Sequence, residues 1–235
     1  MDAPPPAFPG TLNATEGRYR NASLPRRLAL ASAALPVAIL LAVALQPWVP
    51  AHELLRDPMA TVGERSDCCG LHLGLVSYLG VGLWASTAAI CLFAALCLRD
   101  EPAERASTVR FLVGAGLLSV WLTLDDLLML HERVLPDLGV PELATYAVYG
   151  VAGLAHLRVA LRVASPGIAA PGTRALLFVA IASLGASVVS DTILEAAGWA
   201  VPIGLEDGAK LVGITFWLAF HTALAHARLA ARTSA

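Results

Sequence analysis

Charged side chains are scarce in this sequence. Only 14% of its 235 residues are charged and 57% are hydrophobic, whereas soluble domains are about 45–50% apolar. This balance excludes an ordinary soluble domain and predicts an integral membrane protein, with the lipid bilayer as its main partner. The net charge of −2 gives no sign of nucleic-acid binding, which needs a basic surface.

The sequence also lacks a spaced cysteine framework. Its four cysteines are the adjacent pair Cys68 and Cys69 in a polar stretch, and Cys91 and Cys97 within one apolar run. We expect the latter two to be small core residues. We expect the adjacent pair to be an ordinary pair of loop residues, and metal binding or oxidation is the alternative.

Residues 1–25 lack a periodic apolar face and are rich in Pro, Ala, Asn and Ser. Such a segment buries too little apolar surface to fold, so we expect it to be disordered. Two N-glycosylation patterns begin at Asn13 and Asn21. Because the orientation argued below puts this segment in the cytoplasm, we expect both to be chance matches.

Long apolar runs are what the sequence does contain, and about 20 such residues cross a hydrocarbon core of about 30 Å. We predict an all-α, polytopic bundle over residues 26–228, followed by a short tail, 229–235. The predicted spans, six in number, are 28–49, 71–98, 109–132, 143–163, 174–199 and 204–227. A cleaved signal peptide is the alternative for the first run, because Ala42-Val-Ala44 resembles a cleavage site.

Basic residues near the ends of the spans indicate orientation, because cytoplasmic loops are enriched in Lys and Arg. An N-terminus in the cytoplasm puts twelve of the 16 basic residues on the inner side. The outer side then holds four: Arg56, Arg65, Arg133 and Lys210. We therefore expect both termini to be cytoplasmic.

The most informative stretch is residues 121–133, at the outer end of the third predicted span. Asp125 and Asp126 lie inside the apolar run, and His131 and Glu132 follow within two turns. Ionisable residues within a membrane span are costly and mark functional sites. A regular helix would put Asp125 and Glu132, seven residues apart, on one stripe.

Further acidic residues are predicted at the same depth in the last two spans. Asp191 and Glu195 lie in the fifth span, and the sixth opens with Glu206, Asp207 and Lys210. Seven potential negative charges then face only two positive ones, Arg133 and Lys210. Bound metal and protonated carboxyl groups are two ways to balance this surplus. Hydration at the headgroup level is the alternative for Glu132, Glu195, Glu206 and Asp207.

The histidines are expected to have different roles. His131 beside Glu132 is the best metal-ligand candidate, suited to zinc, iron or manganese, and a solvated helix cap is its alternative. His156 makes a core hydrogen bond or takes part in a proton relay, and His221 and His226 are expected to be structural. His72, near His52 and Glu53, is a second-rank candidate. The simplest role of Lys210 is an ion pair within its own helix.

The motif Leu124-Asp-Asp-Leu-Leu-Met-Leu-His-Glu132, with Leu205-Glu-Asp-Gly-Ala-Lys-Leu-Val-Gly213, resembles a group of uncharacterised bacterial multi-pass membrane proteins. That resemblance implies a real site and a bacterial inner-membrane location. A more distant similarity is to the alkaline ceramidase-like membrane hydrolases, which hold zinc with histidines and an aspartate. This similarity would make Asp125, Asp126 and His131 zinc ligands. The superfamily has seven membrane spans, however, and six are expected here.

The leading hypothesis is a metal-dependent membrane hydrolase that acts near the outer leaflet. Asp125, Asp126, His131, Asp191 and Glu206 would hold or surround the metal, and Glu132 or Glu195 would accept a proton. A carboxylate-rich di-iron oxidase is a variant, although its Glu-x-x-His repeats are absent. A proton- or cation-coupled carrier or sensor is the alternative, and a non-catalytic accessory subunit a further one. Substrate, protein partners and homo-oligomer formation are left open.

Overall fold

The computed structural model describes residues 12–56, 58, 70–100, 106–165, 169–190, 192 and 204–233, with the side chains of residues 12–22 left out. This part of the chain is helical and contains no extended strand, which confirms the all-α prediction. The elements are α1 (Leu12–Leu45), α2 (Ala51–Leu55), α4 (Leu75–Cys97), α5 (Ala106–Leu128), a π-helical turn (Leu130–Val134), α6 (Leu135–Asp137), α7 (Glu142–Val163), α8 (Thr173–Val189) and α9 (Leu205–Thr233).

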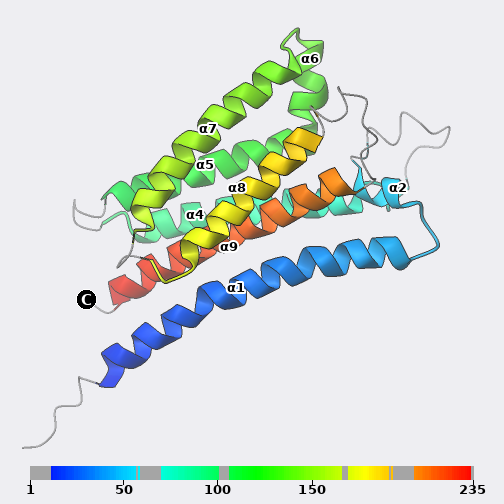
Figure 1. Ribbon diagram of the computed structural model, residues 1–235. Coiled ribbons are helices and arrows are strands. Elements are labelled where there is room, and N and C mark those ends of the chain that lie inside the picture. Colours follow the sequence, from blue (N-terminus) through cyan, green and yellow to red (C-terminus); the bar gives the residue numbers. More distant parts are fainter. Residues whose placement is uncertain are drawn as a thin grey trace, which may run out of the picture.

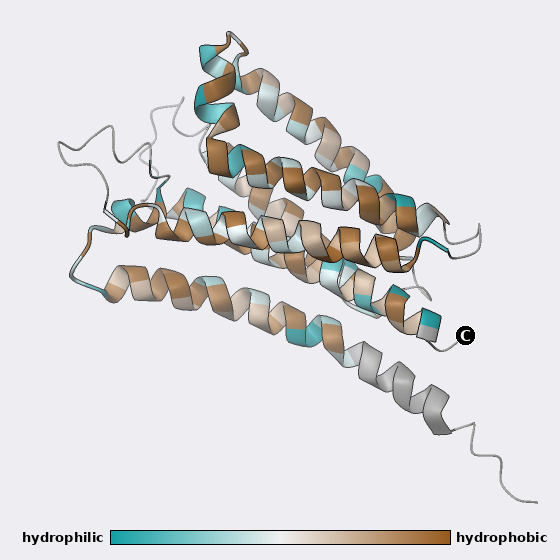
Figure 2. Cartoon of the chain, turned by 180° about the vertical axis from the view of Figure 1, so that it is seen from behind, coloured by the Kyte–Doolittle hydropathy of each residue, from teal (hydrophilic) through white to brown (hydrophobic). Residues whose placement is uncertain are grey.

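Four helices of the described residues are long and apolar enough to cross a membrane. They are Ser23–Leu45, Leu75–Cys97, Ala106–Leu128 and Leu205–Arg232. Helix α8 is apolar but shorter, and α7 carries charged residues such as Arg158 and Arg162. Figure 2 shows that hydrophobic residues dominate these helices along most of their length. The chain is therefore a membrane protein by length and composition, with four of the predicted spans meeting that standard.

Several predicted boundaries differ from the observed ones. Helix α1 begins at Leu12, so residues 12–25 are helical although they were expected to be disordered. Extending an existing helix is much less costly than starting one, which allows a polar sequence to continue the apolar run. The third helix ends at Leu128, four residues before the predicted end. The later part of the predicted fifth span lies outside the described residues.

Helix α9 is the central element of the bundle. It packs along α8, α4 and α1, and α4 packs along α5. Figure 1 shows that α9 runs antiparallel to α8 and α1 and in the same direction as α4. A close approach of α8 and α9 depends on Gly213, where an added Cβ would lie 2.6 Å from the Leu184 Cγ atom. The core around α9 includes Phe220, Leu224 and Ile214, all fully buried.

A proline explains how α1 is attached to α9. Pro36 lies inside α1 and has no N–H to give to the Ser32 carbonyl four residues earlier. The Thr215 hydroxyl of α9 lies within hydrogen-bonding distance of that carbonyl, at 3.0 Å, and of the Val212 carbonyl, at 2.8 Å. The Ser32 hydroxyl donates to the Thr215 carbonyl over 3.1 Å. A backbone group left without a partner in lipid is costly, so these bonds hold the two helices together.

Arginines satisfy the last carbonyls of α7. Arg174 donates to the carbonyls of Ala164 and Leu161, at 2.9 and 3.0 Å, and Arg228 donates to that of Val163 at 2.9 Å. Cationic groups at a helix C-terminus also interact favourably with the helix dipole. This end of α7 is fixed to α8 and α9, whereas its other end lies apart from α8, near α6 (Figure 1).

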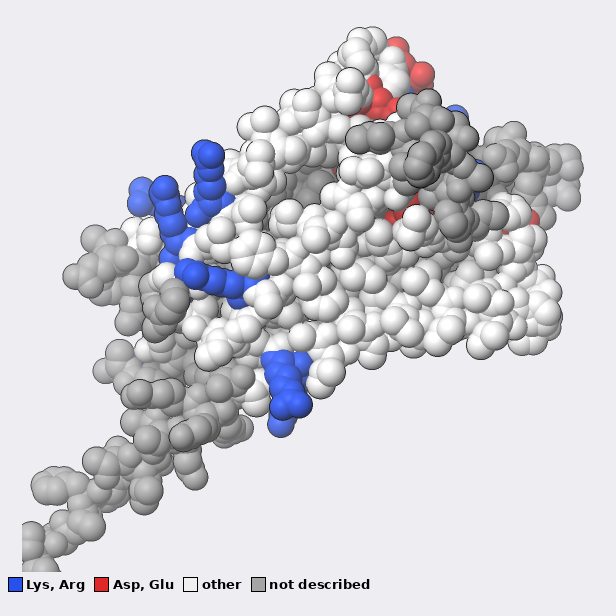
Figure 3. All heavy atoms as spheres, in the orientation of Figure 1, with Lys and Arg blue, Asp and Glu red and all other residues white. Residues whose placement is uncertain are grey.

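The charges of the molecule are separated along the bundle. Figure 3 shows Lys and Arg mainly toward the end where the C-terminus lies, and Asp and Glu at the opposite end. The basic end holds Arg158 and Arg162 of α7, Arg174 of α8 and Arg232 of α9. The acidic end is where α5 finishes and α9 begins. Among the described residues, the acidic side chains of the third and sixth predicted spans therefore lie at the same end of the bundle, as expected.

Candidate functional site

The site begins at a break in the chain after α5. Met129 has a positive φ of 50°, and a π-helical turn from Leu130 to Val134 follows it. In a regular helix Asp125 and His131 would be about 120° apart around the axis and about 9 Å apart along it. The predicted continuation of the helix to Glu132 is therefore wrong, and the break brings His131 to Asp125. Such π-helical turns occur often at functional sites.

Asp125 and His131 form a doubly hydrogen-bonded pair. The His131 backbone N–H donates to Asp125 Oδ1 over 3.1 Å, and Nδ1 of the ring donates to Oδ2 over 2.7 Å. Asp125 is 2% exposed and His131 is 8% exposed, so the alternative of a solvated cap is wrong. Because Nδ1 carries the donated proton, the free electron pair of a neutral ring lies on Nε2.

The second ring nitrogen of His131 faces another carboxylate. Its Nε2 lies 3.5 Å from Glu132 Oε1, so a proton or another cation between these two atoms is favoured. Burial alone would lower the pKa of His131, which lies beyond the apolar span that ends at Leu128. The hydrogen bond to Asp125 and the charges of Asp125 and Glu132 outweigh burial and raise this pKa above its ordinary 6.5.

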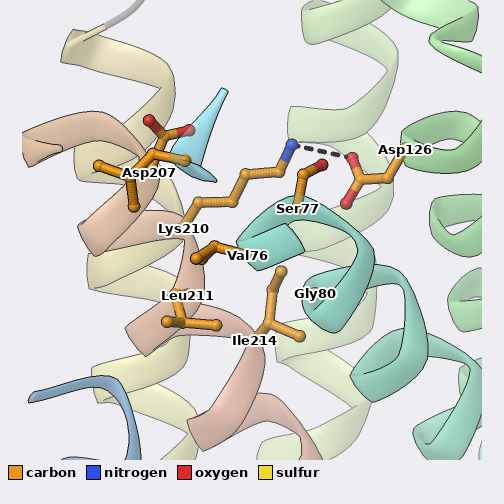
Figure 4. A pocket seen from close by; sticks show the side chains of 9 residues that line it. Val76, Ser77, Gly80, Asp126, Asp207, Lys210, Leu211 and Ile214 are labelled. Atoms are coloured by element: carbon orange, nitrogen blue, oxygen red, sulfur yellow. Dashed lines mark ion pairs between the residues drawn. The ribbon is translucent and has the colours of Figure 1, made fainter. Parts of the chain in front are cut away.

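Asp126 points to different partners from those of Asp125. Its Oδ2 accepts a hydrogen bond of 3.0 Å from the Trp84 indole of α4, and its Oδ1 lies 3.0 Å from Lys210 Nζ of α9. Figure 4 shows this ion pair crossing from α9 to α5. Lys210 therefore pairs with a residue of another helix, in addition to any ion pair within its own helix. A small cavity of about 20 Å³ beside the pair has room for about one water.

A much larger cavity, of about 520 Å³, lies next to the Asp125–His131 pair. Helices α5, α7, α8 and α9 supply most of its described wall. Tyr149 of α7 accepts a hydrogen bond of 3.1 Å from the Trp121 indole and lines this cavity together with Asp125. The cavity volume is within the range of about 300–1,000 Å³ that is usual for small-molecule sites.

The remaining predicted site residues divide into three groups. Glu206 and Lys210 line the large cavity with Asp125, Asp126, His131 and Glu132, and Asp207 lines the small one. His72 pairs with Glu53, its Nε2 lying 2.9 Å from Oε2, and is not among the described residues of the large cavity wall. Asp191, Glu195 and the pair Cys68 and Cys69 lie outside the described residues.

The described residues bring no three His, Cys, Asp or Glu side chains together at metal-binding distance. Of the predicted metal ligands, Asp125 and His131 contact each other directly, and His131 Nε2 also faces Glu132 Oε1 at 3.5 Å. Asp126 is directed to Trp84 and Lys210. Asp125 and His131 thus pair with each other and Asp126 has other partners, while Glu206 lines the large cavity and Asp191 lies outside the described residues.

His156 and His221 form a second histidine pair, deep among aromatic rings. His221 Nδ1 donates to the Trp217 carbonyl over 2.8 Å, so its Nε2 accepts from His156 Nε2 over 3.3 Å. The rings of Phe111 and Trp217 lie 5.0 and 4.6 Å from that of His156. This geometry agrees with the core hydrogen bond that was one alternative for His156, and with a structural role for His221.

Sequence reasoning missed the aromatic partners of the acidic pair. Trp84 and Trp121 belong to different predicted spans, and each donates its indole N–H to a polar group of the site. Buried indole and phenol groups usually need a hydrogen-bond partner. A tryptophan within an apolar span rich in Gly and Ala, as at position 84, was the signal that would have indicated a buried acceptor.

Comparison with known proteins gives one match. A model of a domain of unknown function (DUF8692) matches residues 28–224, which include every described lining residue of the large cavity. No curated protein and no solved structure matches the chain. The resemblance to ceramidase-like hydrolases thus stays an expectation. Because the matched segment covers well over half of the chain, the protein belongs to the DUF8692 family.

Proposed function

We propose that the protein is a membrane-embedded hydrolase in which His131 acts as the base and Asp125 positions it. The observation that carries the proposal is the 2.7 Å bond from His131 Nδ1 to Asp125 Oδ2 beside a large cavity. A carboxylate on Nδ1 fixes the tautomer that leaves Nε2 able to accept a proton, as in known histidine bases. A raised pKa also brings the base closer to neutral pH.

The proposed step is the addition of water to a carbonyl group. Nε2 of neutral His131 removes a proton from water while the oxygen of that water forms a bond to the carbonyl carbon, giving a tetrahedral intermediate. The bond to the leaving oxygen or nitrogen then breaks, and that atom takes the proton from His131. The products are a carboxylic acid and an alcohol or amine, and His131 returns to its neutral state.

Electrostatics favour an uncharged ester or amide over a phosphate ester. The described cavity wall carries the carboxylates of Asp125, Asp126, Glu132 and Glu206, against Lys210 and His131. A phosphate in this setting would meet more negative than positive charge, and like charges in a poorly solvated site repel strongly. A neutral carbonyl compound avoids that cost.

A metal-dependent form of the same enzyme is the second candidate. It is favoured by the 3.5 Å separation of His131 Nε2 and Glu132 Oε1, since both are good ligands for zinc, iron or manganese. Asp125 would then hold the metal-binding histidine in place. Element analysis of wild type and His131→Ala separates the two forms: stoichiometric metal that the variant loses supports the metal-dependent one.

We further propose that the six long helices all span the bacterial inner membrane, with both termini in the cytoplasm. The separation of basic and acidic ends supports this orientation (Figure 3), because cytoplasmic ends are enriched in arginine. The acidic cavity end would then lie near the outer leaflet. Cysteine labelling from outside intact cells, in a Cys68→Ser/Cys69→Ser background, tests it: Leu138→Cys should react, and Ser165→Cys should not.

The activity is tested with purified protein in nanodiscs and a set of C16 acyl esters and amides. The set includes cationic, neutral and anionic leaving groups, so that it does not presuppose one head group. We expect release of the fatty acid by wild type and loss of at least about 10²-fold in rate in His131→Ala. Equal rates in the two proteins, or no hydrolysis of any member, would contradict the proposal.

A further inference from the structure

The wall of the large cavity is divided into a polar and an apolar part. Its polar end is formed where α5 finishes and α9 begins, with Asp125, His131 and Glu206. Away from that end the described wall is apolar and includes Leu118 and Leu122 of α5, Leu157 of α7, and Ile181 and Leu184 of α8. This division matches an amphiphile whose head lies beside the proposed base.

The cavity is open toward the side of the bundle. Leu154 of α7 and Val188 and Val189 of α8 line it, yet they are 62%, 38% and 43% exposed. Such residues belong to the rim of an opening. Helix α7 touches α8 only sparsely, whereas α8 packs along α9. The rim is apolar and lies between two long helices, so it faces the hydrocarbon of a surrounding membrane.

From this lining we infer that the cavity takes a single-chain amphiphile with a cationic head group, which enters from the lipid between α7 and α8. The inference adds a substrate class to the proposed hydrolase. That the bound molecule is hydrolysed rests on the proposed function, whereas its binding does not. Four carboxylates of the described wall, against Lys210 and His131, favour a cation. A zwitterionic or anionic head would bring a negative charge among these carboxylates.

The dimensions of the cavity agree with one alkyl chain. The lining residues of α7 run from Tyr146 to Leu157, a length of about 16 Å at 1.5 Å per residue. A volume of about 520 Å³ is typical of sites for one drug-sized molecule and is too small for a phospholipid with two long chains. Gly150 and Gly153 leave the α7 wall without a side chain at these two positions.

Those glycines allow the cavity to be filled without disturbing the helix. A Cβ added at Gly153 would meet nothing within 4 Å, so Gly153→Leu places a side chain in open space of the cavity wall. Gly114 of α5 also has nothing within 4 Å and does not line the cavity. Gly114→Leu is therefore a matched control, and leucine favours a helix more than glycine does in both variants.

The experiment measures binding of two spin-labelled C16 amphiphiles in phosphatidylcholine nanodiscs. One carries a trimethylammonium head and the other a sulfate head, so neither charge depends on pH. We expect an immobilised component for the trimethylammonium probe with wild type and Gly114→Leu. Gly153→Leu should weaken its binding about tenfold or more, and Gly185→Leu, on the α8 side, should do the same if Gly153→Leu does not fold.

Equal immobilisation of the sulfate probe would overturn the cationic head, and unchanged binding by both filled variants would overturn the cavity as the binding place. Binding is measured without hydrolysis, so this test is independent of the proposed activity. Binding of the cation by His131→Ala without any turnover in wild type would retain the inference and reject the hydrolase. Hydrolysis without binding of the trimethylammonium probe would retain the hydrolase and reject the inference about the cationic head group.

Discussion

The two histidine pairs of this protein differ in what surrounds them. His131 is bonded to a buried carboxylate and lines a cavity with Glu132. His221 is fully buried, donates to a backbone carbonyl and accepts from His156, with aromatic rings on its sides. A histidine next to carboxylates and a cavity has a means of exchanging protons with a ligand. One enclosed by rings satisfies its hydrogen bonds and fills space.

The two acidic residues before His131 show the same contrast at shorter range. Asp125 is bonded to the ring of His131, and Asp126 to Trp84 and Lys210. Adjacent residues on a helix point in directions about 100° apart. The role of each carboxylate is thus set by which helix it faces, and a cluster of like residues need not be a single site.

The largest effect is expected from Asp125→Asn. An amide at this position can present its NH₂ group to His131 Nδ1 and stabilise the wrong tautomer, so the rate of acyl hydrolysis should fall by about 10²–10⁴-fold. The measurement is fatty-acid release per mole of folded protein. His156→Phe, which keeps a ring in the aromatic cluster, is the control and should retain most of the activity. A comparable loss in both variants would remove the distinction between the pairs.

The second prediction concerns stability, for which we expect the buried pair of His156 and His221 to matter more than the pair of Asp125 and His131. His221→Ala should lower the free energy of unfolding by about 3 kcal/mol, because it leaves a cavity in a fully packed core. His131→Ala opens into space that already exists, so we expect a smaller loss, of about 1–2 kcal/mol. Unfolding in mixed micelles by titration with sodium dodecyl sulfate measures both. A greater loss in His131→Ala would show that the cavity end is the structural core.

A third prediction concerns pH. Activity requires neutral His131, so it should rise with pH through an inflection above 6.5, the ordinary pKa of histidine. Glu132 is one of the charges that raise this pKa. Glu132→Gln should therefore move the inflection to lower pH, by less than about one unit because Glu132 is partly exposed. An inflection that stays in place would show that another group titrates.

The smallest effect is expected from Asp126→Asn. The amide can still accept from Trp84 but loses the charge that pairs with Lys210, so we expect less than about a tenfold loss of activity. Rates for Asp125→Asn and Asp126→Asn, measured on the same preparation of substrate, compare the two neighbours directly. Similar losses would mean that the carboxylates act as one unit.

Much of the fold could be predicted from the sequence because apolar runs are its strongest signal. The helices of residues 75–97, 142–163 and 205–233 lie close to predicted spans. Successive long helices run in opposite directions, so the end of α5 and the start of α9, which carry the acidic residues, lie at the same end of the bundle. The extension of α1 to Leu12 was missed, since a polar segment that continues an existing helix has no apolar periodicity of its own.

The site was predicted in composition but not in pairing. Asp125, Asp126, His131 and Glu132 were identified because each is costly in an apolar run. Their partners depend on the break at Met129, a residue with no conformational signal for positive φ. Without that break His131 would not reach Asp125, and Lys210 was assigned to its own helix because its contact with Asp126 is a long-range one.

The measurement that tests the account most directly is chemical rescue of His131→Ala. The truncated side chain leaves room beside Asp125 for a free imidazole, which can accept the same proton. Palmitoylcholine, an acyl ester with one chain and a permanent cation, is the substrate. We predict that wild type releases palmitate, that the variant does not, and that added imidazole restores release in proportion to its neutral fraction. Release by the variant at the wild-type rate without imidazole would contradict the account.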